Sequence, residues 1–172
     1  MKLVRTLAHM CLLLCAATTA RAQTFTFELD NPRASISIPS LPQLKMELHA
    51  LHQKQAHLRY SGKAMPYAIS ILTPTSTPGM TAVECATGHI RTLSRIPGVP
   101  PSDAIFKTKI NEHTYAAIYA VPMEGFVMLH AHFVSAVGGT HCVQVHASKV
   151  SRSQEDLDPW FKGFGQANIE AK

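Results

Sequence analysis

Residues 126–149 read FVMLHAHFVSAVGGTHCVQVHASK and give the clearest structural signal in the chain. Two apolar runs flank the pair Gly138-Gly139. Apolar runs joined by a glycine pair are typical of a β-hairpin, because glycine readily adopts the backbone angles that a tight connection requires. We therefore predict strands over residues 126–137 and 141–149, and we expect the rest of the fold to be arranged around them.

Segments before this hairpin predict further strands. The segment 24–29 alternates apolar and polar residues with the period of a half-buried strand. Other strands, each bounded by proline, asparagine or glycine turns, are predicted over residues 35–38, 67–72, 104–110 and 114–121. Residues 46–60 fit a strand and a helix about equally well, and we favour extended structure there.

Two helices are predicted. Thr81 and Glu84 have the spacing of a capping box, so a helix should begin there and continue to about Ser94. The acidic start of the segment 151–158 favours a second helix, whose apolar side chains at helical spacing should join the core: Leu157, Trp160, Phe161 and Phe164. We therefore expect the α+β class, with an antiparallel sheet flanked by two helices.

The start of the chain indicates export. Residues 1–22 have a positively charged beginning, a short apolar stretch and the sequence Ala20-Arg21-Ala22, which together are typical of a signal peptide and its cleavage site. The apolar stretch is too short to span a bilayer, and we predict no transmembrane segment elsewhere. Residues 23–172 should then form a single secreted α+β domain in the periplasm or outside the cell.

The predicted cleavage changes the charge and the cysteine count. The chain has a formal net charge of +5, and Lys2, Arg5 and Arg21 would leave with the signal peptide. The remaining basic residues are scattered, so we expect no nucleic-acid binding. Only Cys85 and Cys142 remain of the four cysteines, and one disulfide between them is expected in an oxidising compartment.

Histidine is unusually frequent in the predicted hairpin. His130 and His132 are two residues apart in a strand, so both side chains lie on one face and are suited to bind one zinc or copper ion. A hairpin loop with an even number of residues would place His132 opposite Val145 and bring His141 onto the histidine face. An odd number would place His132 opposite His146. The sequence leaves both alternatives open.

Other candidate sites carry weaker signals. The spacing of His49, His52 and His57 matches no ligand pattern, and we expect a solvated stretch there. The chain lacks G-x-S-x-G, H-E-x-x-H, C-x-x-C, P-loop and dinucleotide-binding motifs, so we predict no catalytic residues. The proline-rich loops 73–79 and 96–102 are the better candidates for contact with a partner, because stiff loops lose less entropy on binding.

The order of the predicted elements resembles that of the PsbP/Mog1-like domain, which is shared by the photosystem oxygen-evolution protein PsbP and the nuclear-transport factor Mog1. Trp160 and Phe164 on the C-terminal helix add to the resemblance. It implies a PsbP/Mog1-like sandwich and mostly binding and assembly roles, including those of periplasmic immunity proteins that block secreted bacterial toxins. No functional residue is carried over from it.

These observations favour an exported, periplasmic, non-enzymatic protein that needs no cofactor and recognises another protein. An immunity or inhibitor role is the most concrete form of this hypothesis. The alternative is a zinc- or copper-binding protein of the cell envelope that uses His130 and His132 with His141 or His146. The sequence leaves the identity of the partner and the oligomeric state open.

Overall fold

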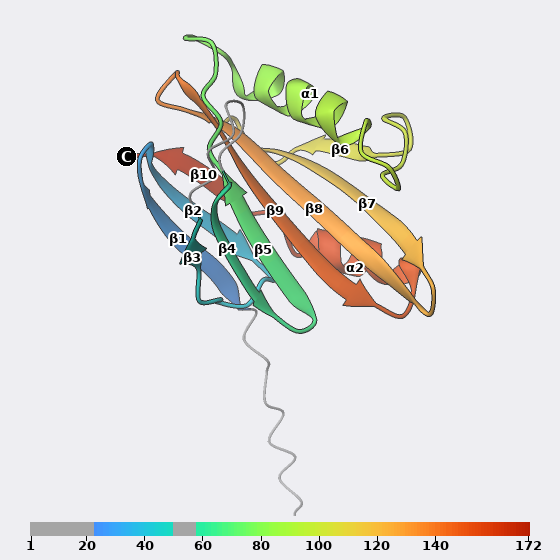
Figure 1. The fold of residues 1–172 in the computed structure, drawn as a ribbon. Coiled ribbons are helices and arrows are strands. Elements are labelled where there is room, and N and C mark those ends of the chain that lie inside the picture. The colour runs from blue at the N-terminus through green and yellow to red at the C-terminus, as the bar shows by residue number, and fades with distance from the viewer. Residues whose placement is uncertain (1–22, 50–57) are drawn as a thin grey trace, which may run out of the picture.

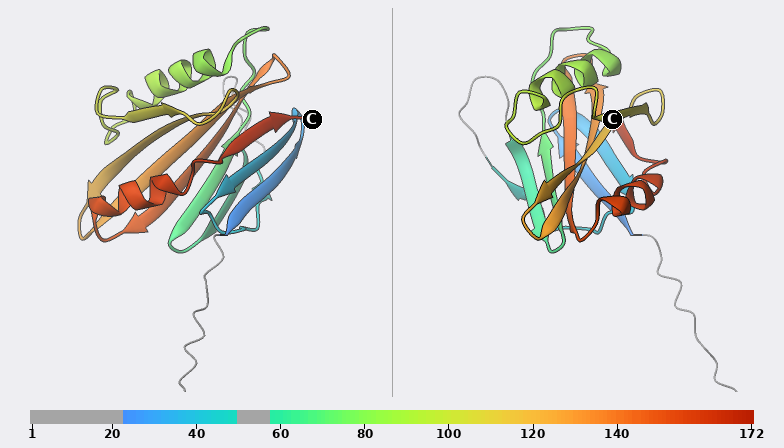
Figure 2. Two further views of the ribbon diagram at one scale, coloured as in Figure 1. Left: turned by 180° about the vertical axis from the view of Figure 1, so that it is seen from behind. Right: turned by 90° about the vertical axis from the view of Figure 1, so that its right-hand side faces the viewer.

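The computed structural model describes residues 23–49 and 58–172, and the predicted signal peptide of residues 1–22 lies outside the described residues. Two antiparallel sheets pack against each other, and helix α1 (Ala82–Leu93) lies on the opposite, outer face of the larger sheet (Figures 1 and 2). Among the described residues, no helix combines the length and the apolar character needed to cross a membrane.

The larger sheet contains seven strands in the spatial order β3 (Glu47–Leu48), β4 (Leu58–Ala64), β5 (Tyr67–Leu72), β9 (His141–Ser151), β8 (Phe126–Val137), β7 (Tyr115–Met123) and β6 (Phe106–Lys109). The smaller sheet contains β1 (Thr24–Asp30), β2 (Arg33–Pro39) and β10 (Asn168–Ala171), with β2 in the middle. After β9, a short 3-10 helix (Gln154–Asp156) leads into α2 (Leu157–Lys162).

The expected α+β class, a sheet flanked by two helices, is wrong. Strands account for 49% and helices for 15% of the described residues, and the fold is a β-sandwich. The inner face of the larger sheet is covered mainly by the smaller sheet, because β10 pairs with β2 and completes a second layer. Helix α2 has only six residues and adds to one side of that layer (Figure 2). The resemblance to the PsbP/Mog1-like domain stays a prediction.

Most of the individual elements are confirmed. The predicted hairpin is formed by β8 and β9, and α1 begins with the predicted capping box between Thr81 and Glu84. The described part of the ambiguous segment 46–60 is extended, with β3 and the start of β4. The predicted strand at 104–110 is shorter than expected and covers Phe106–Lys109.

The main core lies between the two sheets. Alternate residues of β8 face it, including Leu129 and Phe133, which are fully buried. The smaller sheet contributes Phe25 and Ile36 to the same cluster. Trp160 and Phe164 are also buried there, as predicted, although Phe164 lies beyond the end of α2.

Helix α1 covers part of the outer face of the larger sheet. Its buried residue Cys85 is bonded to Cys142 of β9, so the predicted disulfide pair is present at an S–S distance of 1.95 Å. A small apolar cluster surrounds this bond, and a second one lies beneath Leu93 near the other end of the helix. The disulfide therefore fixes α1 to the strand that carries His146.

We expect Cys85→Ser and Cys142→Ser to destabilise the oxidised protein equally. The bond joins residues 57 positions apart, and in the chain-entropy model a loop of this length corresponds to about 4 kcal/mol of stabilisation. The double variant should lose no more than either single variant, because all three lack the same bond. Urea unfolding followed by circular dichroism measures this, and additive losses would contradict it.

Candidate metal centre

The register of the β8–β9 hairpin places His132 directly opposite His146. Val137 pairs with His141, so the connection contains three residues, and its two glycines have φ angles of 61° and 67°. These left-handed backbone angles favour glycine. Of the two alternatives that the sequence allowed, the loop with an odd number of residues is the one that occurs.

Three histidines meet on the outer face of the sheet. The potential ligand nitrogens of His130, His132 and His146 all lie within 4.8 Å of one another. Nδ1 of His130 is 2.9 Å from Nε2 of His146. The rings of His132 and His146 are stacked, with centroids 4.2 Å apart and planes 6° from parallel. We call these three residues the histidine cluster.

Two further side chains hold the ring of His132. Nε2 of His89, on α1, is 2.9 Å from Nδ1 of His132, and the Tyr119 hydroxyl of β7 is 3.2 Å from its Nε2. His89 follows Cys85 by four residues and so lies on the same side of α1, which the disulfide fixes to the sheet. Our sequence analysis missed both residues, although this four-residue spacing was a usable signal for His89.

The other predicted histidines lie elsewhere. His141 falls on the opposite face of β9 from His146 because side chains alternate along a strand, and its Nδ1 is 3.0 Å from the Thr140 hydroxyl. It is not a member of the histidine cluster. His49 is half-buried, with Nε2 2.8 Å from the Ser61 hydroxyl. His52 and His57 lie outside the described residues.

Burial keeps the clustered imidazoles neutral. It lowers the pKa of His130 to about 4. Burial, together with smaller contributions from His130 and His89, lowers the pKa of His146 to about 3. Burial also lowers the pKa of His132 well below its usual value, with a further contribution from the neighbouring histidines. The pKa of His89 falls to about 4 for the same main reason, although Gln144 opposes the change. Neutral imidazoles retain the nitrogen lone pairs that bind metals.

Tyr119 stays protonated beside this cluster, because burial raises its pKa to about 12. Its hydroxyl can then donate to Nε2 of His132 when the His132 proton is on Nδ1. That Nδ1–H in turn donates to Nε2 of His89. One neutral tautomer of His132 therefore satisfies both observed contacts.

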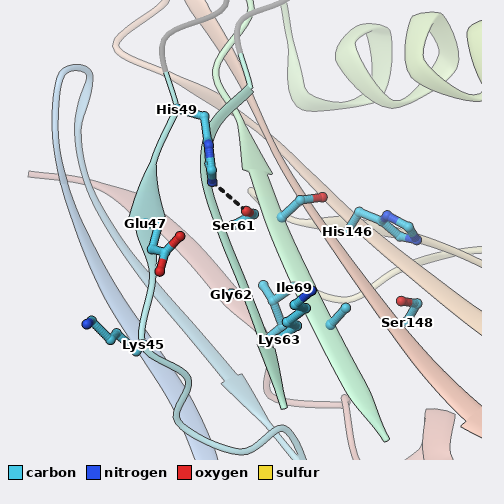
Figure 3. A pocket seen from close by; sticks show the side chains of 11 residues that line it. Lys45, Glu47, His49, Ser61, Gly62, Lys63, Ile69, His146 and Ser148 are labelled. Atoms are coloured by element: carbon cyan, nitrogen blue, oxygen red, sulfur yellow. Dashed lines mark hydrogen bonds between the residues drawn. The ribbon is translucent and has the colours of Figure 1, made fainter. Parts of the chain in front are cut away.

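Two clefts reach the histidines. The first, of about 640 Å³, lies between α1 and the segment 72–77, and its lining includes His89, His132 and His146. We call it the α1 cleft. The second, of about 620 Å³, lies over β3, β4 and β5, with the His49–Ser61 hydrogen bond on one side and His146 on the other (Figure 3). In Figure 3 the ring of His146 extends away from β5.

No protein-family model matches the sequence, and a search of curated proteins finds no significant match. The function is therefore inferred from the residues of the site.

We expect the metal-free protein to lose stability as the pH falls from about 6.5 to about 4. Histidines of the unfolded chain take up protons near pH 6.5, whereas the buried ones resist until about pH 4 or below. The unfolded state therefore binds more protons in this range, and each such histidine contributes a slope of up to about 1.4 kcal/mol per pH unit. Urea unfolding at a series of pH values measures the slope.

The variant His89→Gln separates this effect from the titration of carboxylates. Its slope between pH 6.5 and 4 should be smaller than that of the wild type, whereas His113→Gln, at an exposed position, should match the wild type. Equal slopes in all three proteins would show that the buried histidines do not control the acid sensitivity.

Proposed function

We propose that this chain binds a divalent transition-metal ion, zinc or copper, through His130, His132 and His146. The observation that supports this is the convergence of their potential ligand nitrogens within 4.8 Å. Imidazole suits both metals, and sites with three histidines are well known for zinc. Of the two hypotheses drawn from the sequence, the metal-binding alternative is thus the one that the geometry supports.

The nitrogens are close enough for one ion, but the rings must turn to bind it. With Zn–N bonds of 2.0–2.1 Å, two nitrogens of a tetrahedral site lie about 3.4 Å apart. The 2.9 Å contact between His130 and His146 is shorter than this value, and the 4.8 Å limit of the cluster is longer. The rings of His132 and His146 are stacked with planes 6° from parallel. Because the lone pair of a ring nitrogen lies in the ring plane, at least one of these rings must rotate before both can bind the same ion. For both facing nitrogens to bind the ion, the ring proton that lies between His130 and His146 would have to move to the other nitrogen of its own ring.

His89 has the position of a residue that orients a ligand. Metal-bound histidines usually donate their second ring N–H to a neighbouring group, which fixes the tautomer and the ring orientation. The Nδ1 of His132 has such a neighbour in Nε2 of His89, 2.9 Å away. His132 would therefore bind the metal through Nε2. In the structure this nitrogen lies beside the Tyr119 hydroxyl.

Three protein ligands leave a coordination position open, and an ion bound there supplies Lewis acidity to whatever occupies that position. Storage or sensing of a metal needs no further group.

The disulfide and the lack of a membrane-spanning helix in the described residues are compatible with export. A location in the cell envelope remains part of this proposal. The protein partner and the immunity or inhibitor role stay predictions.

We expect the purified residues 23–172 to bind one equivalent of zinc or copper(II) in equilibrium dialysis at pH 7.5. His130→Gln, His132→Gln and His146→Gln should each weaken metal binding at least about 100-fold, because each substitution removes one of the three imidazole ligands and leaves only two. His89→Gln should weaken it about 10- to 100-fold, as expected for a residue that orients a ligand.

His141→Gln and His113→Gln are the matched controls, because neither residue belongs to the histidine cluster. Both should bind metal as the wild type does, and circular dichroism should show that every variant is folded. Binding that survives all three cluster substitutions, or that depends on His141, would refute the proposed centre.

A further inference from the structure

The α1 cleft has the size and the lining of a site for a small molecule. Its volume of about 640 Å³ lies within the usual range for ligand pockets. Its lining includes His89, His132 and His146. The apolar part of its wall is contributed by both sides of the cleft, namely Leu72, Pro74, Met80, Leu93 and Ile96. The cleft thus combines apolar walls with the imidazoles of the proposed metal centre.

Gly88 leaves this cleft open. It lies in the interior of α1, where glycine is less stable than alanine. Close packing does not require it, since apart from its two neighbours in the chain and the helix's own backbone no atom lies within 4 Å of the position that a Cβ would take. Gly88 lines the cleft, and it directly precedes His89 in the sequence. A side chain at this position would therefore project into open space beside the histidines.

The charge of the proposed centre favours an anion at the open position. Three neutral imidazoles do not offset the two positive charges of the ion, and in the described part of the chain no carboxylate belongs to the group of potential ligands. Glu84 also lines the cleft, but its carboxylate accepts hydrogen bonds from the Thr81 backbone N–H and hydroxyl at the start of α1. Buried charges in proteins are normally paired. A ligand that enters through the α1 cleft and carries a negative charge would supply the missing partner.

We propose, building on the metal centre above, that the α1 cleft binds a small carboxylate with an apolar body. The carboxylate coordinates the metal ion held by the histidine cluster, and the apolar body lies along the wall that includes Leu93 and Ile96. The selectivity of the site then has two sources: the ion requires the negative charge, and the wall favours hydrocarbon over a bare anion.

Hexanoate, hexanamide and acetate are suitable probes in isothermal titration of the zinc-loaded protein. Hexanoate should bind at least 10-fold more tightly than hexanamide, which lacks the charge, and than acetate, which lacks the chain. Gly88→Leu should weaken hexanoate binding at least 10-fold because the new side chain fills the cleft. Gly88→Ala is the matched control: it also removes the glycine from the helix but should stay within about threefold of the wild type.

Zinc content is measured on the same samples, so that the two proposals fail in different ways. One equivalent of zinc without any preference for hexanoate, or equal hexanoate binding by the wild type and Gly88→Leu, would overturn the carboxylate site and leave the metal centre intact. A wild-type protein that retains neither zinc nor, after loading with copper(II), copper would overturn the metal centre itself, and the carboxylate site with it.

Discussion

The pairing of β8 with β9 is the interaction on which the rest of the structure depends. It runs without a shift from Val127 opposite Ser151 to Val137 opposite His141, and β8 and β9 form the centre of the larger sheet with β5 and β7 on either side. Because side chains alternate along a strand, this one register assigns Leu129 and Phe133 to the core and the histidines to the outer face. A shift by one residue would place imidazoles in the apolar core.

Helix α1 covers part of that outer face and forms one side of the candidate site. The bond between Cys85 and Cys142 fixes the helix to β9, which places His89 of the helix within hydrogen-bonding distance of His132 on the sheet. The same helix forms one wall of the α1 cleft, with Gly88 at its lining. The covalent bond, the hydrogen bond to the cluster and the cleft therefore all depend on how one helix lies on the sheet.

The sequence predicts well what short stretches of chain determine. The hairpin, the capping box at Thr81 and the cysteine pair are confirmed because each depends on nearby residues or on simple elimination. The fold class is wrong because β10 has only four residues and its partner β2 lies near the other end of the described chain. His89 was missed because its contact with His132 depends on how the helix packs on the sheet, and its four-residue spacing from Cys85 was the one local signal of that contact.

The contrast between local and distant pairing has a consequence for the order of folding. His130 and His146 belong to one hairpin and are separated by 16 residues, whereas Ser35 and Glu170 pair across most of the chain. Closing a short loop costs less entropy than closing a long one, so the hairpin can form while the smaller sheet is still incomplete. The three histidines of the cluster are thus brought together by a single hairpin. An ion captured at that stage would hold β8 and β9 in register before the second layer of the sandwich arrives.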